Sequence, residues 1–333
     1  MSGTLAPSWK SRPKAPPGLC AGGVFCSRQK NRPPLSMSSP NSAALPATPT
    51  LREAQTLAAM VGLPALEVRM LLTHVTGLSR TQLITRDTDT LTIAQRDAFA
   101  TLLARRLAGE PMAYLIGERE FFGRKFRVTP DVLIPRPDTE VAAEASLARL
   151  AEVPQPTVLD LGTGSGILAV TLARERRDAQ VWATDISPGA LMVAQDNASA
   201  LGADRIHFLV SDWYAALPAG LRFHLIVSNP PYIAEGDPHL AEGDLRFEPI
   251  DALTDHDDGL SDLRVIVAGA GARLLPGGWL LMEHGYDQAQ ATRQLLEDAG
   301  FTGVFTARDL AGLERCTGGR WPGAQPGGIT AAH

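Results

Sequence analysis

The sequence predicts an α/β protein, with a small all-helical N-terminal domain before an open, mostly parallel sheet of seven strands. Two observations predict this class. From residue 157 onward, short apolar segments of strand length alternate with helical patterns, a rhythm typical of parallel strands joined by helical crossovers. Between residues 50 and 110, apolar residues recur at helical spacing instead. The 333 residues are enough for two such domains, and the sheet is expected to be Rossmann-like.

Composition and charge argue against several classes of protein. Hydrophobic residues make up 44% of the chain and charged residues 20%, which suits ordinary buried cores. The net charge of −5 argues against a stable nucleic-acid partner, which a basic surface would have to hold. No run of 18 apolar residues occurs, so we expect no membrane partner. The three cysteines form neither a disulfide framework nor a zinc pattern, which indicates a cytoplasmic location.

The first 49 residues differ from the rest of the chain. Residues 1–49 are rich in Pro, Ser, Gly and Ala and contain no Asp or Glu. Such a segment buries too little apolar surface to offset its chain entropy, so we expect a disordered N-terminal extension. A transit peptide is an alternative, because those are rich in Arg and Ser and poor in acids. An over-long start, with Met37 as the initiator, is the reading we favour.

Residues 50–110 are expected to form a small helical domain. Pro64 opens one helix and Gly77 ends it. Its inner face is expected to carry Leu66, Met70 and Leu71. Thr92 and Gln95 have the spacing of a capping box before a longer helix.

Residues 111–135 change period and are expected to form a β-hairpin connector, because aromatic residues flank a turn at Gly123. Alternate prolines then force an extended backbone before a helix from about Asp138. The α/β domain is expected to span 136–321 and to end in a flexible tail at 322–333. Its five clearest strands are expected at 157–161, 180–184, 206–210, 223–228 and 279–283, with two weaker strands after them. Its helices are expected from Ile167, from Pro188, over 260–275 and over 287–299.

A glycine loop follows the first of these strands, with the sequence Asp160-Leu161-Gly162-Thr163-Gly164-Ser165-Gly166. Alternate glycines let the backbone approach a ligand closely. The dinucleotide fingerprint G-x-G-x-x-G does not fit, because Ile167 stands where its third glycine should be. Asp160 would repel a pyrophosphate, whereas it favours the cationic S-adenosylmethionine. We therefore expect this cofactor to be bound by Gly162, Thr163, Gly164, Ser165 and Gly166.

Two further residues extend the expected cofactor site. Asp185 ends the second strand, 19 residues after Gly166, a spacing that suits a carboxylate accepting both ribose hydroxyls. Asp185 could also cap the helix that begins at Pro188. Trp213 follows the third strand, where the adenine edge would lie. It either walls that pocket or belongs to the core, and the pattern favours the pocket.

Asn229-Pro230-Pro231-Tyr232 follows the fourth strand. Open α/β proteins bind their ligands at these carboxyl ends of the strands. The alternative is a proline turn that only ends a strand. The Asn229 side-chain oxygen can accept one N–H of a planar amide, and the Pro230 carbonyl can be aimed at the second. The Tyr232 ring can stack on the same amide. The motif therefore predicts methyl transfer to a planar nitrogen, catalysed by Asn229, Pro230 and Tyr232, but it does not separate glutamine from a nucleobase amine. No histidine pairing indicates a metal site.

With these motifs, residues 55–320 resemble the protein-(glutamine-N5) methyltransferases of the PrmC/HemK type, which modify class I peptide chain release factors. The resemblance rests on a series of blocks in this order: Gly109 to Pro111, Ile134 to Glu140, Asp160 to Gly166, Ser211 to Trp213, Ser228 to Ile233, Gly243 to Pro249, Glu283 to Gly285, Arg308 to Leu310, and Glu314 with Arg315.

The resemblance implies an S-adenosylmethionine methyltransferase sheet that methylates the glutamine of the release factor Gly-Gly-Gln motif. It implies that Gly162 to Gly166, Asp185, Trp213 and Asn229 contact the cofactor. It also implies that Asn229 to Tyr232 hold the glutamine, and that the helical domain docks the release factor. Methylation of a ribosomal-protein glutamine is one alternative. A nucleic-acid amino-methyltransferase is another, although such enzymes must flip a base and grip phosphates.

Overall fold

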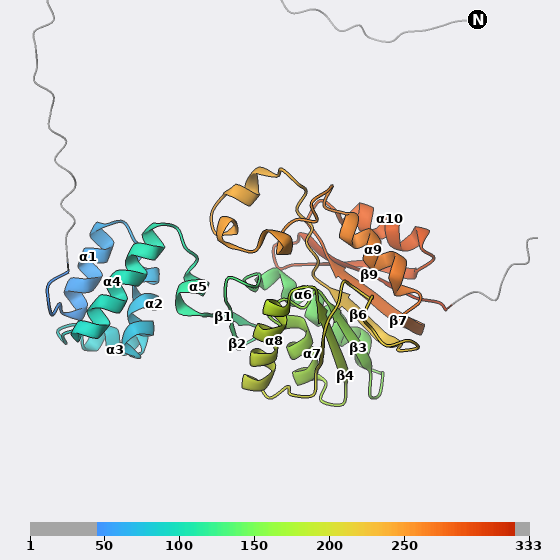
Figure 1. The fold of residues 1–333 in the computed structure, drawn as a ribbon, viewed down its shortest axis with the longest axis horizontal. Helices are drawn as coiled ribbons and strands as arrows, with labels where there is room; N and C mark the ends of the chain where they lie inside the picture. Colours follow the sequence, from blue (N-terminus) through green and yellow to red (C-terminus); the bar gives the residue numbers. More distant parts are fainter. Residues whose placement is uncertain (1–44, 324–333) are drawn as a thin grey trace, which may run out of the picture. The chain divides into compact units, whose positions relative to one another are not determined.

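The computed structural model describes residues 45–323 (Figure 1). Of the expected N-terminal extension, residues 1–44 lie outside this range, and of the expected tail so do residues 324–333. Within the described range, Leu45 packs against the core of the helical domain. None of the helices between residues 45 and 323 has both the length and the apolar character needed to cross a membrane.

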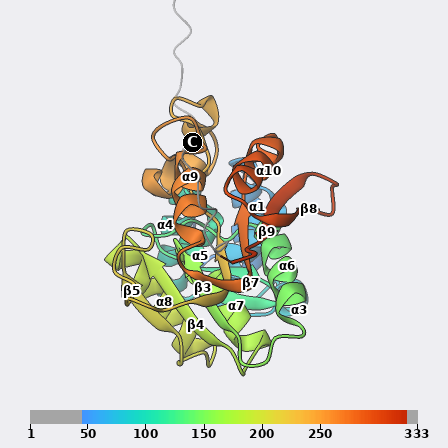
Figure 2. The same cartoon turned by 90° about the vertical axis from the view of Figure 1, so that its right-hand side faces the viewer.

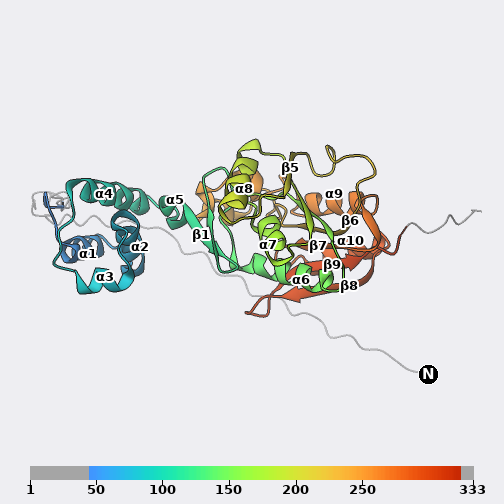
Figure 3. The same cartoon turned by 90° about the horizontal axis from the view of Figure 1, so that it is seen from below.

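Four helices pack together in the N-terminal part of the described chain (Figures 1 and 3). They are α1 (Leu51–Met60), α2 (Ala65–Thr76), α3 (Arg80–Thr85) and α4 (Ile93–Leu107). The expected capping box starts α4, because the Thr92 hydroxyl accepts from the N–H of Gln95 while the Gln95 side chain accepts from the N–H of Thr92. Gly77 ends α2 in a left-handed conformation, as expected.

The expected inner face of α2 is partly wrong. Leu71 is fully buried, but Leu66 is 50% and Met70 37% exposed. Val68 and Leu72 are buried in their place. Both sets follow helical spacing, so the sequence offered two apolar stripes on one helix. Packing of α2 against α1 and α4 selects the stripe that contains Val68, Leu71 and Leu72.

The expected hairpin is present in the connecting segment (Figure 3). It pairs β1 (Glu118–Phe121) with antiparallel β2 (Arg124–Arg127), and both turn residues, Phe122 and Gly123, have positive φ. A short helix that the sequence did not predict, α5 (Met112–Ile116), precedes it. After the hairpin, η1 (Pro137–Thr139) leads directly into α6 (Glu140–Leu150).

The α/β part contains the expected seven-stranded sheet, in the order β5-β4-β3-β6-β7-β9-β8. All neighbouring strands are parallel except β9, which is antiparallel to β7 and β8. The strands are β3 (Thr157–Leu161), β4 (Gln180–Asp185), β5 (His207–Val210), β6 (Phe223–Ser228), β7 (Leu274–Glu283), β8 (Thr302–Arg308) and β9 (Glu314–Arg320). The chain reverses its direction of progress between β3 and β6, which creates a switch point where open sheets bind ligands.

Helices cover both faces of this sheet (Figure 2). One face packs against α6, α7 (Ile167–Glu175) and α8 (Pro188–Ala200), and the other against α9 (Ser261–Ala270) and α10 (Ala289–Asp298). The helix expected over 260–275 is shorter, because Leu274 already pairs with Phe223 in β7. Between β6 and α9 lie three short turns that the sequence did not predict: η2 (Pro238–Ala241), η3 (Leu245–Phe247) and η4 (Ile250–Ala252).

Candidate functional site

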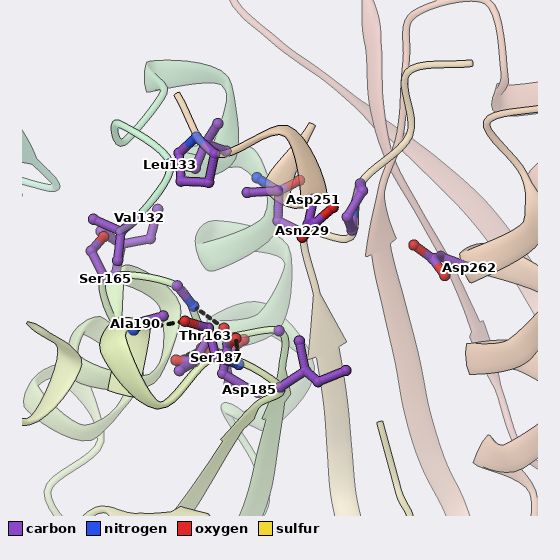
Figure 4. A pocket seen from close by; sticks show the side chains of 18 of the residues that line it. Val132, Leu133, Thr163, Ser165, Asp185, Ser187, Ala190, Asn229, Asp251 and Asp262 are labelled. Atoms are coloured by element: carbon purple, nitrogen blue, oxygen red, sulfur yellow. Dashed lines mark hydrogen bonds between the residues drawn. The ribbon is translucent and has the colours of Figure 1, made fainter. Parts of the chain in front are cut away.

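A cavity of about 450 Å³ lies at the carboxyl ends of β3, β4 and β6 (Figure 4). Eight of the residues singled out in the sequence line it, namely Gly162, Thr163, Gly164, Ser165, Asp185, Trp213, Asn229 and Pro231. Gly166, Pro230 and Tyr232 are not part of the lining. The glycine loop, the end of β4 and the Asn-Pro-Pro-Tyr turn, which are separate in sequence, therefore surround one ligand-sized space.

The glycine loop needs glycine at three positions. Gly162, Gly164 and Gly166 all have left-handed backbone, with φ of 67°, 55° and 83°, which is unfavourable for residues with a Cβ. At Gly166 space is also lacking, because a Cβ would lie 3.0 Å from the Cβ of Ala194 in α8. Gly166 therefore serves the packing of α7 on α8, while the loop before it lines the cavity.

Asp160 organises the glycine loop from below. Its Oδ2 accepts from the Thr163 hydroxyl (2.6 Å) and from the N–H of Ala169 (3.0 Å). The side chain is buried, and this burial raises the pKa of Asp160 to about 7. Asp160 therefore carries less charge toward a ligand than its place at the strand end suggested, and it holds the loop in shape instead.

Asp185 links the glycine loop to the start of α8. Its Oδ2 accepts from the N–H of Gly164 and its Oδ1 from the N–H of Ser187, both at 2.9 Å. Ser187 itself caps α8 by accepting from Ala190, so the expectation that Asp185 could cap this helix is wrong. Burial raises the pKa of Asp185, while the two backbone N–H groups oppose that rise. Each carboxylate oxygen keeps a lone pair for a ligand hydroxyl.

Trp213 lies over the glycine loop. A Cβ built on Gly162 would lie 3.6 Å from Cζ3 of the Trp213 ring. The tryptophan has a left-handed backbone, with φ of 42°, which is an uncommon conformation for a bulky residue. It lines the cavity and also packs against the core on the α9 side of the sheet. Trp213 is therefore placed to serve both as a cavity wall and as a core residue, while its contact with an adenine stays a prediction.

The cavity is acidic. Among the described residues that line it, seven are aspartates: Asp131, Asp160, Asp185, Asp212, Asp251, Asp255 and Asp262. Arg136 is the one arginine among those residues, and it forms an ion pair with Glu248. Such a wall disfavours a polyphosphate and suits a cationic ligand, since like charges brought together in a cavity repel each other.

Asn229 follows β6 at the floor of the switch point. Its Nδ2 donates to Oγ1 of Thr139 at 3.2 Å. Its Oδ1 is buried and has no hydrogen-bond partner among the described residues. Buried amide oxygens are nearly always paired in folded proteins. An unpaired one on a cavity-lining residue therefore indicates a donor that a ligand would supply.

Arg136, which lines the cavity, forms a partly buried ion pair with Glu248 that sequence reasoning missed. Arg136 forms an ion pair with Glu248, and the N–H of Ile134 donates to Oε2 of the same carboxylate at 2.9 Å. The two partners lie 112 residues apart in the sequence, and the Glu248 side chain is fully buried. The sequence holds a weak signal, since Arg136 stands between two prolines and Glu248 immediately before one. The pairing itself needed the tertiary structure.

Glu283, the last residue of β7, is a buried carboxyl group that was also missed as a site residue. The hydroxyl of Tyr232 donates to its Oε1 at 3.4 Å. Burial raises the pKa of Glu283 to about 7. Burial and this neighbouring acid also raise the pKa of Tyr232, which keeps the phenol neutral. Over residues 45–323, no three His, Cys, Asp or Glu side chains are placed to hold a metal ion.

Comparison with known proteins supports the resemblance to glutamine methyltransferases that the motifs indicated. Residues 50–117 match the model of the PrmC N-terminal domain, and residues 138–243 match that of the methyltransferase small domain. A release factor glutamine methyltransferase from Burkholderia pseudomallei is 56% identical over 78% of this chain and 93% of its own length. One from Bordetella pertussis is 58% identical over 78% of this chain and 95% of its own length.

This chain belongs to the release factor glutamine methyltransferase family. The resemblance inferred from the motifs is thereby confirmed, as is the class of enzyme, an S-adenosylmethionine-dependent methyltransferase. Among solved structures, a T. thermophilus 16S rRNA methyltransferase in complex with AdoMet and guanosine is 26% identical. It covers 61% of this chain and 49% of its own, with a TM-score of 0.45.

Proposed function

We propose that this enzyme transfers the methyl group of S-adenosylmethionine to the side-chain amide nitrogen (N5) of the glutamine in the Gly-Gly-Gln motif of class I peptide chain release factors. The names of its relatives support the substrate. The observation that carries the chemistry is the buried Oδ1 of Asn229, which has no partner within residues 45–323 and belongs to a residue that lines the acidic cavity.

The residues present fit this cofactor. The left-handed glycines leave the loop without side chains where the cofactor would approach. The lining aspartates other than Asp160 suit its sulfonium and ammonium groups. We propose that Gly162 to Ser165, which line the cavity, contact the cofactor, that Asp185 accepts its ribose hydroxyls, and that Trp213 walls the adenine. When bound, S-adenosylmethionine supplies an electrophilic methyl group.

The Asn-Pro-Pro-Tyr turn is proposed to hold the acceptor. A glutamine amide nitrogen is a weak nucleophile, because its lone pair is delocalised into the carbonyl. The Oδ1 of Asn229 accepts one N–H, and the carbonyl of Pro230 accepts the other. Together with Pro231, which stiffens the turn, they aim the nitrogen, while the neutral Tyr232 stays fixed beside them through Glu283. The nitrogen keeps its proton until the methyl has moved, so the rate comes from alignment and fixed dipoles.

The domains divide this work, in our proposal. The helical domain over 50–110 contacts the release factor, the connector over 111–135 joins it to the catalytic part, and residues 136–321 hold the cofactor and the glutamine. The match of residues 50–117 to the PrmC N-terminal domain supports the first assignment. We place the reaction in the cytoplasm, where translation occurs.

Mass spectrometry tests the proposal directly. A release factor is incubated with the enzyme and with cofactor carrying an isotopically labelled methyl group, and its peptides are then mapped. We expect one labelled methyl on the glutamine of the Gly-Gly-Gln motif, and none on a release factor in which that glutamine is replaced by alanine. A label found only on a ribosomal-protein glutamine, or only on nucleic acid, would establish one of the alternatives instead.

A further inference from the structure

The side-chain amide of Asn229 can lie in two orientations that differ by a half turn. Only one of them suits the amide of the glutamine that is to be methylated. With Oδ1 toward the glutamine, it accepts the substrate N–H. With Nδ2 toward it, two donors would face each other. In the structure Nδ2 donates to Thr139, and Oδ1 has no partner in the part of the chain that the structure describes. The productive orientation therefore depends on Thr139 acting as a hydrogen-bond acceptor.

Thr139 does not enforce that role by itself. A threonine hydroxyl has one hydrogen and two lone pairs, so it can accept from Nδ2 of Asn229 or donate to its Oδ1. Donation would favour the unproductive orientation. Thr139 is fully buried, so bulk water does not compete for its hydrogen. The hydroxyl hydrogen must therefore be engaged elsewhere if Asn229 is to stay correctly turned.

Glu283 is placed to engage it. In the sheet Ser228 pairs with Met282, so the next residues, Asn229 and Glu283, leave adjacent strands side by side. The Thr139 hydroxyl favours the ionised form of Glu283 and lowers its pKa against the effect of burial. One carboxylate oxygen already accepts from Tyr232, while Oε2 is buried and has no hydrogen-bond partner among the described residues. Among the described residues, this acceptor without a donor thus lies on the strand next to Asn229, whose amide contacts the Thr139 hydroxyl.

We propose that Glu283 and Thr139 are positioning residues for methyl transfer, in which the Glu283 carboxylate takes the Thr139 hydrogen and Thr139 in turn holds Nδ2 of Asn229. The same carboxylate anchors the hydroxyl of Tyr232, so it fixes both ends of the Asn-Pro-Pro-Tyr turn. This proposal rests on the proposed function, since it concerns the orientation of an amide that receives the substrate N–H.

The arrangement requires Glu283 to be ionised. Burial raises its pKa to about 7, and Asp138 adds to the rise, while Thr139, Tyr232 and Arg315 oppose it. Arg315 is bonded to Asp138 at 3.0 Å and to Asp309 at 2.8 Å, and so is not a direct partner of Glu283. The buried thiol of Cys316 also faces this carboxylate, and its own pKa is raised. Protonation of Glu283 would free the Thr139 hydrogen and turn Asn229 the wrong way.

Three threonine variants test the relay at the pH where wild type is most active. Thr139→Val removes the hydroxyl, and we expect kcat to fall about 10-fold or more, with the Kd for S-adenosylhomocysteine within about 3-fold of wild type. Thr139→Ser keeps the hydroxyl and should restore most of kcat. The matched control is Thr171→Val in α7, because Thr171 is equally buried and its hydroxyl has no partner among the described residues. Its kcat should match that of wild type.

Glu283→Gln is nearly isosteric and tests the ionisation. In wild type kcat should fall as the pH drops through about 7, because the active form is the carboxylate. In Glu283→Gln, kcat should be lower than in wild type at pH 8, and its pH profile should lack the acidic limb, the fall in kcat as the pH drops through about 7. Full activity of Thr139→Val, an equal loss in Thr139→Ser, or an unchanged limb in Glu283→Gln would each overturn the positioning role. Absence of glutamine methylation by wild type would instead refute the proposed function, so the two failures are distinguishable.

Discussion

Replacing Asn229 by alanine is expected to separate catalysis from stability. The Oδ1 of Asn229 has no partner among the described residues, so its removal takes no bond from the fold. Loss of Nδ2 breaks one hydrogen bond to Thr139, which contributes about 1 kcal/mol. In the transition state, by contrast, loss of one preorganised polar group typically lowers turnover by about 100- to 1,000-fold, or about 3–4 kcal/mol. We therefore expect a folded, nearly inactive enzyme.

The assay combines three measurements on Asn229→Ala and wild type. Single-turnover methyl transfer to a release factor gives the rate of the chemical step. Calorimetry with S-adenosylhomocysteine gives cofactor affinity, and urea unfolding gives stability. We expect the first to fall by about two to three orders of magnitude and the unfolding free energy to change by about 1 kcal/mol or less. Turnover within a few fold of wild type, with cofactor binding intact, would refute the role given to Oδ1. A large loss of stability would show instead that Asn229 is chiefly structural.

Three further changes follow from the geometry. Gly166→Ala puts a Cβ 3.0 Å from that of Ala194 at a φ of 83°, so urea unfolding should show a loss of about 2–5 kcal/mol; a loss below 1 kcal/mol would contradict the packing role. Asp185→Ala should weaken S-adenosylhomocysteine binding by about 10- to 100-fold in calorimetry, and unchanged affinity would count against the ribose contact. Glu283 has a pKa raised from 4.5 to about 7, so its ionisation opposes folding as the pH rises through that window. The unfolding free energy of Glu283→Gln, relative to that of wild type, should therefore rise by up to about 3 kcal/mol between pH 5 and 8. If the unfolding free energies of the two proteins changed in parallel with pH, the raised pKa of Glu283 would be disproved.

Local patterns in the sequence predicted most of the sheet domain. The β6 strand has the bounds expected for it, Phe223–Ser228, and α8 begins at Pro188 as expected. These features depend on residues a few positions apart, through strand length, capping and the fixed φ of proline. The capping box at Ser79 and Gln82, which starts α3, is a signal of the same kind that was overlooked.

Errors arose where two local patterns were equally good. The stripe containing Leu66 and Met70 and the stripe containing Val68 and Leu72 both suit α2, and only the neighbouring helices decide between them. Leu274 fitted the end of a helix as well as the start of a strand, until its pairing with Phe223 was known. In such cases contacts distant in the sequence override local preference.

The sequence by itself determined which residues we propose to carry the chemistry: the glycine loop, Asp185 and the Asn-Pro-Pro-Tyr turn, because each pairs a residue type with a place at a strand end. Tertiary structure decided what surrounds them. It brought Thr139 to Asn229 across 90 residues, and it placed Glu283 beside Asn229 through the register of β6 against β7. Such neighbours cannot be read from spacing, because a hydrogen bond between buried side chains depends on the packing of whole strands and helices.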